Sequence, residues 1–300
     1  MQLKYSFKKE WAHFSRTFKM WGVIIAILAT AVFIPILFKG ALTYAEAFAL
    51  GGQNMSSASI AVQVSSAGFG GTPGDIGIDM EEEMATYSDA GLMFSLTLTS
   101  FASYGLLAVM LLLMSAAGGE QKKRAMIVPM CSGLEYKNYL IPKFVIYPLF
   151  TFALTFLSAL AAGGLCNAMF PNNKITAAGL FLSGLDISVY MVFVLCVFLS
   201  LGLCTSRAGA MVPCIFFGQM LAESLLEGIG LMRYHPFALL GYAGSGMMTD
   251  PLNGSFDAEI PSFITALALS LVICVIMYFL ALGVLKAKKI NNQEDIAPEF

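Results

Sequence analysis

Charged residues are scarce in this sequence of 300 residues, and their scarcity excludes a soluble globular protein. Asp, Glu, Lys and Arg make up only 12% of the residues, whereas soluble domains contain about 25%. Hydrophobic residues make up 58%. This composition indicates a membrane protein that crosses the bilayer several times. Basic clusters interleaved with aromatic residues are missing outside the membrane-flanking segments, so nucleic-acid binding has no support.

Motifs for catalysis and nucleotide binding are also missing. The sequence has no nucleophile elbow, no His-Glu-x-x-His motif and no phosphate-binding loop ending in Gly-Lys-Ser/Thr. The glycine-rich stretch at 68–77 is not followed by that Lys and hydroxyl residue. The two histidines, His13 and His235, fall on opposite sides of the expected membrane and cannot cooperate. We therefore predict a non-catalytic chain that binds no cofactor and no metal.

Cysteines are few, and none falls in a segment that we expect outside the cell. We predict free thiols that act as small hydrophobic residues, because their positions suit neither disulfides nor a metal site. The six are Cys131, Cys166, Cys196, Cys204, Cys214 and Cys274. We also expect no cleavable signal, because the first apolar run is long enough to span a bilayer and no cleavage site follows it.

Long apolar runs are what the sequence does contain, and they predict an all-α membrane protein with a single six-span domain over 1–300. The expected spans are 20–38, 90–117, 144–170, 177–204, 208–222 and 262–285. The segments between them are an interfacial helix (1–19), an external loop (41–89), a cytoplasmic segment (118–143), a re-entrant external helix pair (223–261) and a cytoplasmic tail (286–300). The re-entrant pair at 223–261 is expected because its apolar pieces are too short to span a bilayer and too apolar for a free loop.

The distribution of positive charge sets the expected orientation. Of the 17 Lys and Arg residues, only Lys39, Lys174 and Arg233 fall in expected external segments. The remainder lie before the first span, within 118–143, at Arg207 or after the last span. Lys and Arg concentrate in cytoplasmic loops. We therefore predict a multi-pass protein of the cell membrane with both termini in the cytoplasm.

The N-terminal segment has the pattern of a helix at a membrane surface. Its aromatic residues Phe7, Trp11, Phe14 and Phe18 are spaced four, three and four apart, which places them on one helical face among several lysines. We expect the aromatic residues to lie in the headgroup layer and the lysines to contact anionic lipids. The alternative is a targeting presequence, which Glu10 and the span that follows directly make less favoured.

Three acidic residues lie near or within the expected spans. Glu223 and Glu227 are four residues apart and so share one helical face. With Asp186, they would suit a proton or cation relay, a pathway or an outer gate if buried. The favoured interpretation places all three near the outer ends of spans four and five, within reach of water or of the re-entrant pair.

The central segment 118–143 contains five Lys or Arg residues and scattered apolar ones, which suits short amphipathic helices that offer an apolar face to a partner. The alternative is a solvated basic loop. The segment opens with Glu-x-Lys-Lys-Arg and ends in Tyr-Leu-Ile-Pro-Lys. Together with the order of the spans, this pattern resembles the permease subunits of ABC-2 type transporters. The residues that match the family pattern are Glu120, Arg124, Ser132, Gly133, Tyr139 and Lys143.

The resemblance covers nearly the whole chain, with two departures: the Pro common before the Tyr/Leu entry to span three is absent, and the loop at 41–89 is longer than in minimal members. It implies that two six-span halves, from the same or different chains, form one pathway. It also implies separate ATPase subunits that use ATP and Mg, and a coupling helix within 118–143. Polar contacts to the ATPase would come from Glu120, Lys122, Lys123 and Arg124.

We expect the pathway to be lined by Phe, Met, Leu and Ser from spans two and five, which suits an amphipathic or lipid-like substrate of the drug or antimicrobial peptide class. The resemblance therefore predicts the permease subunit of an ABC exporter. The main alternative is a secondary transporter or channel driven by a gradient, which inverted repeats and acids deep in the spans would support. A membrane-embedded enzyme or an assembly scaffold is the remaining one.

Overall fold

The computed structural model describes residues 2–16, 18–51, 89–114, 116–117, 135–172, 174–205, 208–231, 234–242 and 260–294. Within these ranges the chain is helical apart from short connections. The elements are α1 (Gln2–Arg16), α2 (Phe18–Gly51), α4 (Ala90–Ser100), η1 (Phe101–Gly105), α5 (Leu106–Met114), α8 (Tyr136–Met169), α9 (Ala177–Thr205), α10 (Ala208–Ile229), α11 (Ala238–Tyr242) and α12 (Ile260–Glu294). Six spans within them are long and apolar enough to cross a membrane, which confirms the prediction of an all-helical, multi-pass chain.

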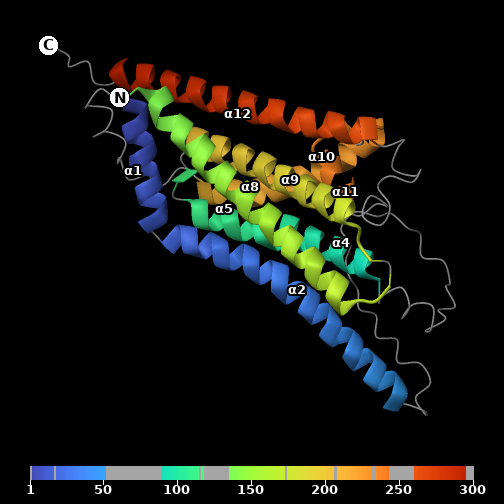
Figure 1. Cartoon of the computed structure of the whole chain (residues 1–300). Helices are drawn as coiled ribbons and strands as arrows, with labels where there is room; N and C mark the ends of the chain where they lie inside the picture. The colour runs from blue at the N-terminus through green and yellow to red at the C-terminus, as the bar shows by residue number, and fades with distance from the viewer. Residues whose placement is uncertain are drawn as a thin grey trace.

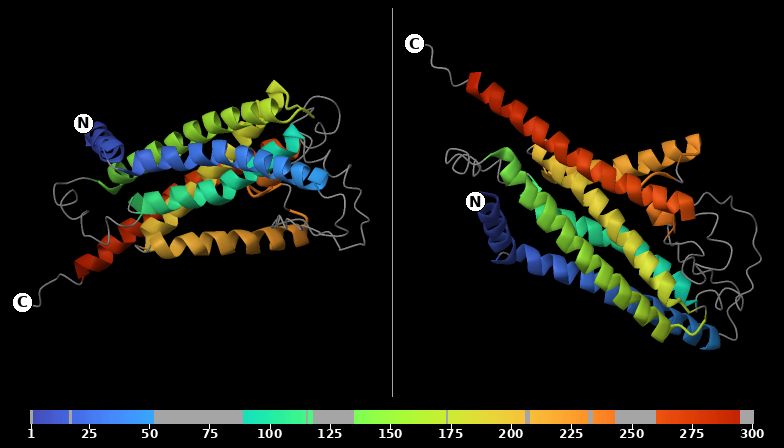
Figure 2. Two further views of the ribbon diagram at one scale, coloured as in Figure 1. Left: turned by 90° about the horizontal axis from the view of Figure 1, so that it is seen from below. Right: turned by 45° about the horizontal axis from the view of Figure 1, so that its top comes forward.

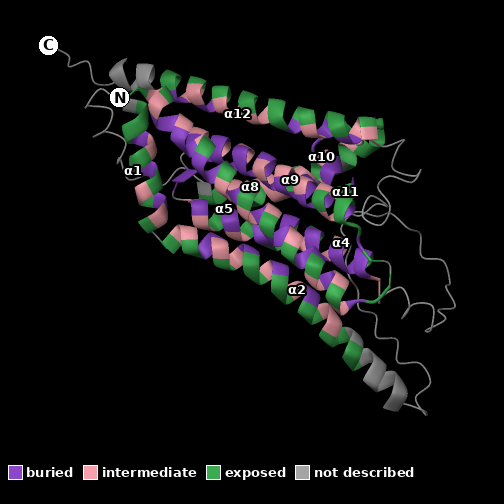
Figure 3. Cartoon of the chain, viewed as in Figure 1, coloured by how far each residue is buried: buried purple, intermediate pink, exposed green. Residues whose placement is uncertain are grey.

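The long helices form a bundle with α9 at its centre (Figure 1). Of the most apolar 18 residues of α9, 72% are buried, against 12% for α10 and 11% for α12. Figure 2 shows α10 and α12 at the outside of the bundle, and Figure 3 shows the long exposed face of α12. Helix α1 and the last turns of α12 lie at the same end of the bundle (Figure 1). The helix α9 is therefore surrounded by protein, whereas α10 and α12 present apolar side chains outward.

The first and third spans are longer than predicted. Helix α2 runs through Gly51, so the expected external loop at 41–89 begins with helix, and residues 52–88 lie outside the described part. The sequence 42–50 is rich in Ala, Leu and Glu, good helix formers that carry the helix past the apolar run. Helix α8 begins at Tyr136 rather than at Phe144, so the end of the expected cytoplasmic segment is already part of the third span.

The fifth and sixth spans also extend beyond their predicted ends. Helix α10 continues to Ile229, so the first residues of the expected re-entrant segment belong to it, and the chain turns at Gly230, whose φ is 74°. Glycine adopts this left-handed conformation without strain, which explains why the helix ends there. Only α11 and its flanking turn represent the re-entrant pair among the described residues. Helix α12 continues to Glu294, well into the expected tail.

The second span contains a π-helical turn, η1, between α4 and α5. The backbone N–H of Leu106 bonds the carbonyl of Phe101, five residues earlier. At the beginning of this span, the Asp89 carboxylate caps α4 by accepting the N–H groups of Gly91 at 2.7 Å and Leu92 at 3.3 Å. The N–H of Ala90 donates to the carbonyl of Asn172 at 2.9 Å, which joins this end to the turn between α8 and α9.

Helices α8 and α9 are joined by that short turn and pack closely along their length. A Cβ built on Gly163 would lie 2.7 Å from Leu180 Cδ1, and one on Gly184 would lie 3.5 Å from the Phe156 ring and 3.7 Å from Ala159 Cβ. Small residues of this kind let helix backbones approach each other in a membrane. The contact between α8 and α9, hereafter the α8–α9 seam, is the most extensive helix pair of the structure.

Candidate functional site

The N-terminal helix α1 packs against the beginning of α8, and this contact forms the candidate site. The buried face of α1 carries Ser6, Glu10 and Phe14, which are spaced four residues apart. The ring of Phe14 meets those of Tyr147 at 5.1 Å and Phe150 at 5.0 Å, both in edge-to-face geometry. This buried face fixes α1 to the third span.

The prediction of one aromatic face on α1 is therefore wrong in part. Phe14 is 1% exposed and belongs to the protein core, and Phe7 packs against the same core. Trp11 and Phe18 are 49% and 75% exposed and remain available to a headgroup layer. The buried face of α1 therefore differs from the predicted aromatic face. It includes Glu10, whose partner Lys143 lies on α8, and the spacing of the aromatic residues cannot reveal that contact.

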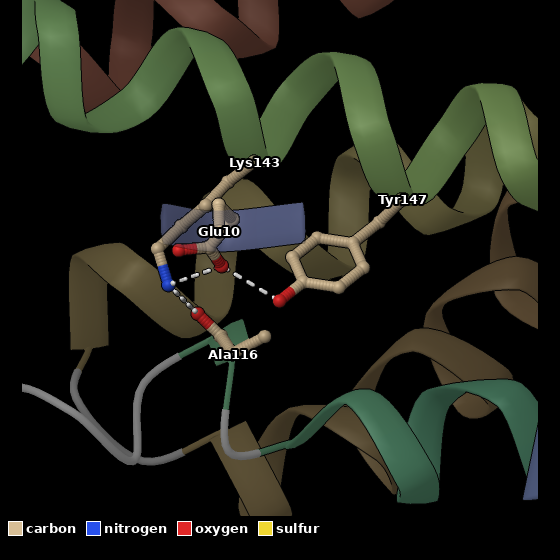
Figure 4. A network of polar contacts seen from close by, with 4 residues as sticks. All are labelled: Glu10, Ala116, Lys143 and Tyr147. Atoms are coloured by element: carbon tan, nitrogen blue, oxygen red, sulfur yellow. Dashed lines mark hydrogen bonds and ion pairs between the residues drawn. The ribbon is translucent and has the colours of Figure 1, made fainter. Parts of the chain in front are cut away.

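A polar network joins three segments at this contact, as Figure 4 shows. The ammonium Nζ of Lys143 lies 3.3 Å from Glu10 Oε1 and donates to the backbone carbonyl of Ala116, also at 3.3 Å. The hydroxyl of Tyr147 donates to the same Glu10 oxygen at 2.6 Å. The network thereby connects α1, the residues that follow α5 at the end of the second span, and the first turns of α8.

Burial makes this network costly to disturb. The Lys143 side chain is 0% exposed and that of Glu10 is 11% exposed. A buried charge that loses its partner pays the desolvation cost without compensation, so each group requires the other. The Nζ atom also lies 4.9 Å from the centre of the Tyr139 ring, where a cation is attracted by the ring face. We therefore expect α1, Ala116 and α8 to move together.

The structure places the predicted coupling residues in two groups. Tyr139 and Lys143 lie in the first turns of α8, and both are buried, so neither is exposed to a partner in this conformation. The other six lie outside the described residues: Glu120, Lys122, Lys123, Arg124, Ser132 and Gly133. The described chain resumes at Glu135, one residue before α8. Both flanks of the unplaced stretch are thus close to the network, at Ala116 and in the first turns of α8.

The three acidic residues of the expected spans are not equivalent. Asp186 is 0% exposed in the interior of the bundle, so the water-accessible position, one of the two that the favoured prediction allowed, is wrong for this residue. The error arose because α9 has helices on all sides, which hydropathy does not reveal. Glu223 and Glu227 lie in the last turns of α10, and Glu227 is exposed. Asp186 and Glu227 therefore share no exposed surface.

Sequence reasoning missed the polar stripe of α8. Its members recur every three or four residues and so lie on one face of the helix: Tyr139, Lys143, Tyr147, Thr151, Thr155 and Ser158. All are buried. The spacing alone indicates a helix face turned toward protein, because lipid offers no partner for these groups. Among the described residues, no cluster of three or more His, Cys, Asp or Glu side chains is placed to hold a metal.

Comparison of the chain with protein-family models, with curated proteins and with solved structures gives no match in any of the three. The resemblance to ABC-2 permeases therefore stays a prediction from the sequence.

Proposed function

We propose that the chain is the membrane-spanning subunit of an ATP-driven exporter, moved by a separate ATPase that binds within 118–134. The observation that carries the proposal is the buried network of Glu10, Lys143 and Tyr147. It holds the segments on both sides of that stretch, at Ala116 and at the beginning of α8, together with α1. A displacement of 118–134 by a partner is therefore transmitted to the second and third spans at once.

In this mechanism the partner supplies ATP hydrolysis and its Mg, and this chain supplies the pathway. Dimerisation of the ATPases would favour one arrangement of the spans over the other, which is alternating access by rigid-body motion. Helix α1 acts as a second contact point with the moving unit, because Glu10 and Phe14 fix it to α8. The charge asymmetry of the sequence supports a cytoplasmic position for this end of the bundle.

The outer helices suit the remaining partners of the proposed assembly. Helices α10 and α12 present their apolar side chains away from the bundle, with exposed residues such as Phe217, Leu221 and Phe279. Lipid covers such faces in a single chain, and a second permease half covers part of them in a dimer. The amphipathic or lipid-like substrate class follows from the Phe, Met, Leu and Ser content of spans two and five.

The test uses the full chain purified from its native membrane together with whatever ATPase accompanies it. We expect an ATPase with a phosphate-binding loop, and we expect its substrate-stimulated activity to be lost when Lys122, Lys123 and Arg124 are all changed to Gln. The matched control changes Lys286, Lys288 and Lys289 to Gln. It removes the same charge from the same expected side, and stimulation should persist. Unchanged stimulation in the first variant would contradict the proposal.

A second candidate function is a transporter driven by an ion gradient, and the buried Asp186 favours it. Its distinguishing result is substrate uptake by proteoliposomes that contain this chain alone, with a proton or cation gradient and no ATP. Uptake under those conditions would replace the first proposal. Uptake that requires the ATPase and ATP would exclude the second.

A further inference from the structure

The carboxyl group of Asp186 lies deep in the bundle, and no described residue supplies a counter-charge to it. Its side chain is 0% exposed, and neither carboxyl oxygen has a hydrogen-bond partner among the described residues. Four hydroxyl oxygens are equally buried and also lack a partner within the described part of the chain. They belong to Thr151, Thr155 and Ser158 of α8 and to Ser183 of α9. A buried polar group normally has a partner, so five such groups on two packed helices indicate a ligand.

Nearby cations do not supply the missing partner. Gly184 of α9 meets Phe156 and Ala159 of α8, which places Asp186 near that level of the α8–α9 seam. Lys143 lies some fourteen residues earlier on α8, about 20 Å away along the helix axis at 1.5 Å per residue. Its ammonium group is already paired with Glu10. The lysine therefore cannot neutralise the carboxylate in this conformation.

Complete burial restricts what the ligand can be. Asp186 is 0% exposed, so an organic cation could reach it only if the helices around α9 separated. A proton requires no cavity, and a protonated carboxyl group can donate to a Ser or Thr hydroxyl.

The energetic argument points the same way. Transfer of an isolated carboxylate from water to an apolar interior costs far more than transfer of the neutral acid, so a buried carboxyl group without a counter-charge takes up a proton instead. Acidic residues within membrane spans recur in proton relays of pumps and transporters for this reason. The neutral acid needs no counter-charge, so it suits the buried position of Asp186.

We propose that Asp186 is a proton-binding site in the interior of the bundle, occupied while the helices around α9 exclude water and emptied when they open to it. The step is a simple dissociation: the carboxyl O–H bond breaks, the proton passes to water, and the carboxylate becomes hydrated. The closed form then binds one proton more than the open form. Raising the pH therefore favours the open form, by up to about tenfold in the equilibrium per pH unit, and lowering the pH favours the closed form.

The other charged groups on the helices packed against α9 lie near the ends of those helices, and the titratable groups nearer the middle are neutral tyrosines and cysteines. The elements η1, α5 and α11 carry no charged residue, and the described charges of α8, α10 and α12 lie in end turns. The charged groups are Lys137 and Lys143 on α8, Glu223 and Glu227 on α10, and those from Lys286 onward on α12. The neutral groups nearer the middle of the spans are Tyr147 and Cys166 on α8, Tyr190 and Cys196 on α9, Tyr104 on η1, Cys214 on α10, and Cys274 and Tyr278 on α12. Asp186 is the only carboxyl group of α9.

Infrared spectroscopy of the purified full chain in lipid nanodiscs tests the proposal directly, without any partner. At neutral pH, exposed carboxyl groups are ionised, and a protonated buried one gives a separate C=O stretching band. We expect this band in the unmodified chain and its loss in Asp186→Asn, which keeps the shape of the neutral acid. The matched control Glu227→Gln removes an exposed carboxyl group and should leave the band unchanged. Absence of the band in the unmodified chain would overturn the proposal.

The pH dependence of thermal unfolding tests the linkage. We expect the unfolding temperature of the unmodified chain to fall, relative to that of Asp186→Asn, as the pH rises from mildly acidic to alkaline. Parallel curves for the two proteins would show that no proton is released and would overturn the proposed linkage. Because both measurements use this chain alone, their failure would leave the proposed ATP-driven function untouched, and failure of the ATPase experiment would leave Asp186 untouched.

Discussion

Helices α9 and α12 are both long and apolar enough to span a membrane, yet their surroundings are opposite. Of their most apolar 18 residues, 72% are buried in α9 and 11% in α12. Helix α9 carries Ser183 and Asp186 in buried positions, whereas the buried Ser270 of α12 bonds the carbonyl of Ala266 in its own helix at 2.7 Å. The two helices touch through Ser200, which donates to the carbonyl of Met277 at 2.9 Å. Apolarity therefore identifies a span. Buried polar side chains that do not bond their own helix indicate that the span is surrounded by protein rather than by lipid.

The same contrast between buried and exposed surroundings exists between two lysines of α8, and it gives the largest expected effect. Lys143→Ala leaves Glu10 without its cation in a buried site and should lower the free energy of unfolding by about 3–5 kcal/mol. The matched control is Lys137→Ala. It breaks a 2.8 Å ion pair with Glu135 in which both side chains are more than half exposed.

We expect no measurable change in stability from that control, because exposed ion pairs contribute little. Unfolding by a denaturing detergent in mixed micelles measures both variants. Equal stabilities of the two variants would show that the contact between α1 and α8 does not bury the pair of Glu10 and Lys143 as described.

A smaller effect is expected from two glycines in contrasting surroundings. Gly163→Leu places a large side chain between Leu180 and Phe94 in the α8–α9 seam, where overpacking costs about 1–3 kcal/mol. Gly283→Leu on α12 meets nothing within 4 Å, so the same substitution should be neutral or slightly stabilising. The shift in unfolding temperature of the two variants measures the difference. A larger loss from Gly283→Leu would reverse the assignment of buried and exposed helices.

The smallest expected effect concerns His235, in the short segment between α10 and α11. Its Nδ1 accepts the N–H of Phe237 at 3.3 Å, and partial burial lowers the pKa of the imidazole below its usual 6.5. The unfolded chain then binds the proton more readily. The contribution of this residue to stability is therefore complete above pH 6.5 and is lost as the pH falls.

The loss should be only a fraction of the roughly 1 kcal/mol of one hydrogen bond. His235→Asn keeps an acceptor and does not titrate, so its unfolding temperature should depend less on acid pH than that of the unmodified chain. Indistinguishable pH profiles would contradict the assignment.

Hydropathy was sufficient to locate the six candidate spans but not to place all of their ends. The runs at 42–51, 136–143, 223–229 and 286–294 continue helices beyond the apolar stretch. A helix ends where its backbone meets a breaker or a cap, as at Gly230, and not where the lipid ends. At these four places the span limits predicted from composition therefore fell inside the helices.

The candidate site was predicted only in part. The pair Glu10 and Lys143 lies 133 residues apart in the chain, and no local pattern predicts such a contact. The polar stripe from Tyr139 to Ser158 was nevertheless readable from its helical spacing, and Glu10 is the only acidic residue of a basic helix. Burial of Asp186 depended on the full packing around α9, which no single helix encodes.

The π turn at Phe101–Gly105 lets the second span lose one residue without disrupting its helices, which a regular α-helical span does not allow. Its wider turn holds an extra residue compared with a regular α-helix. Loss of one amino acid there would convert the turn to regular helix and leave α4 and α5 intact on either side. The same deletion inside α9 would rotate every later side chain by about 100° and turn buried residues of this helix out of the bundle interior. We therefore expect deletion of one residue to be tolerated in the second span and to disrupt the packing of α9.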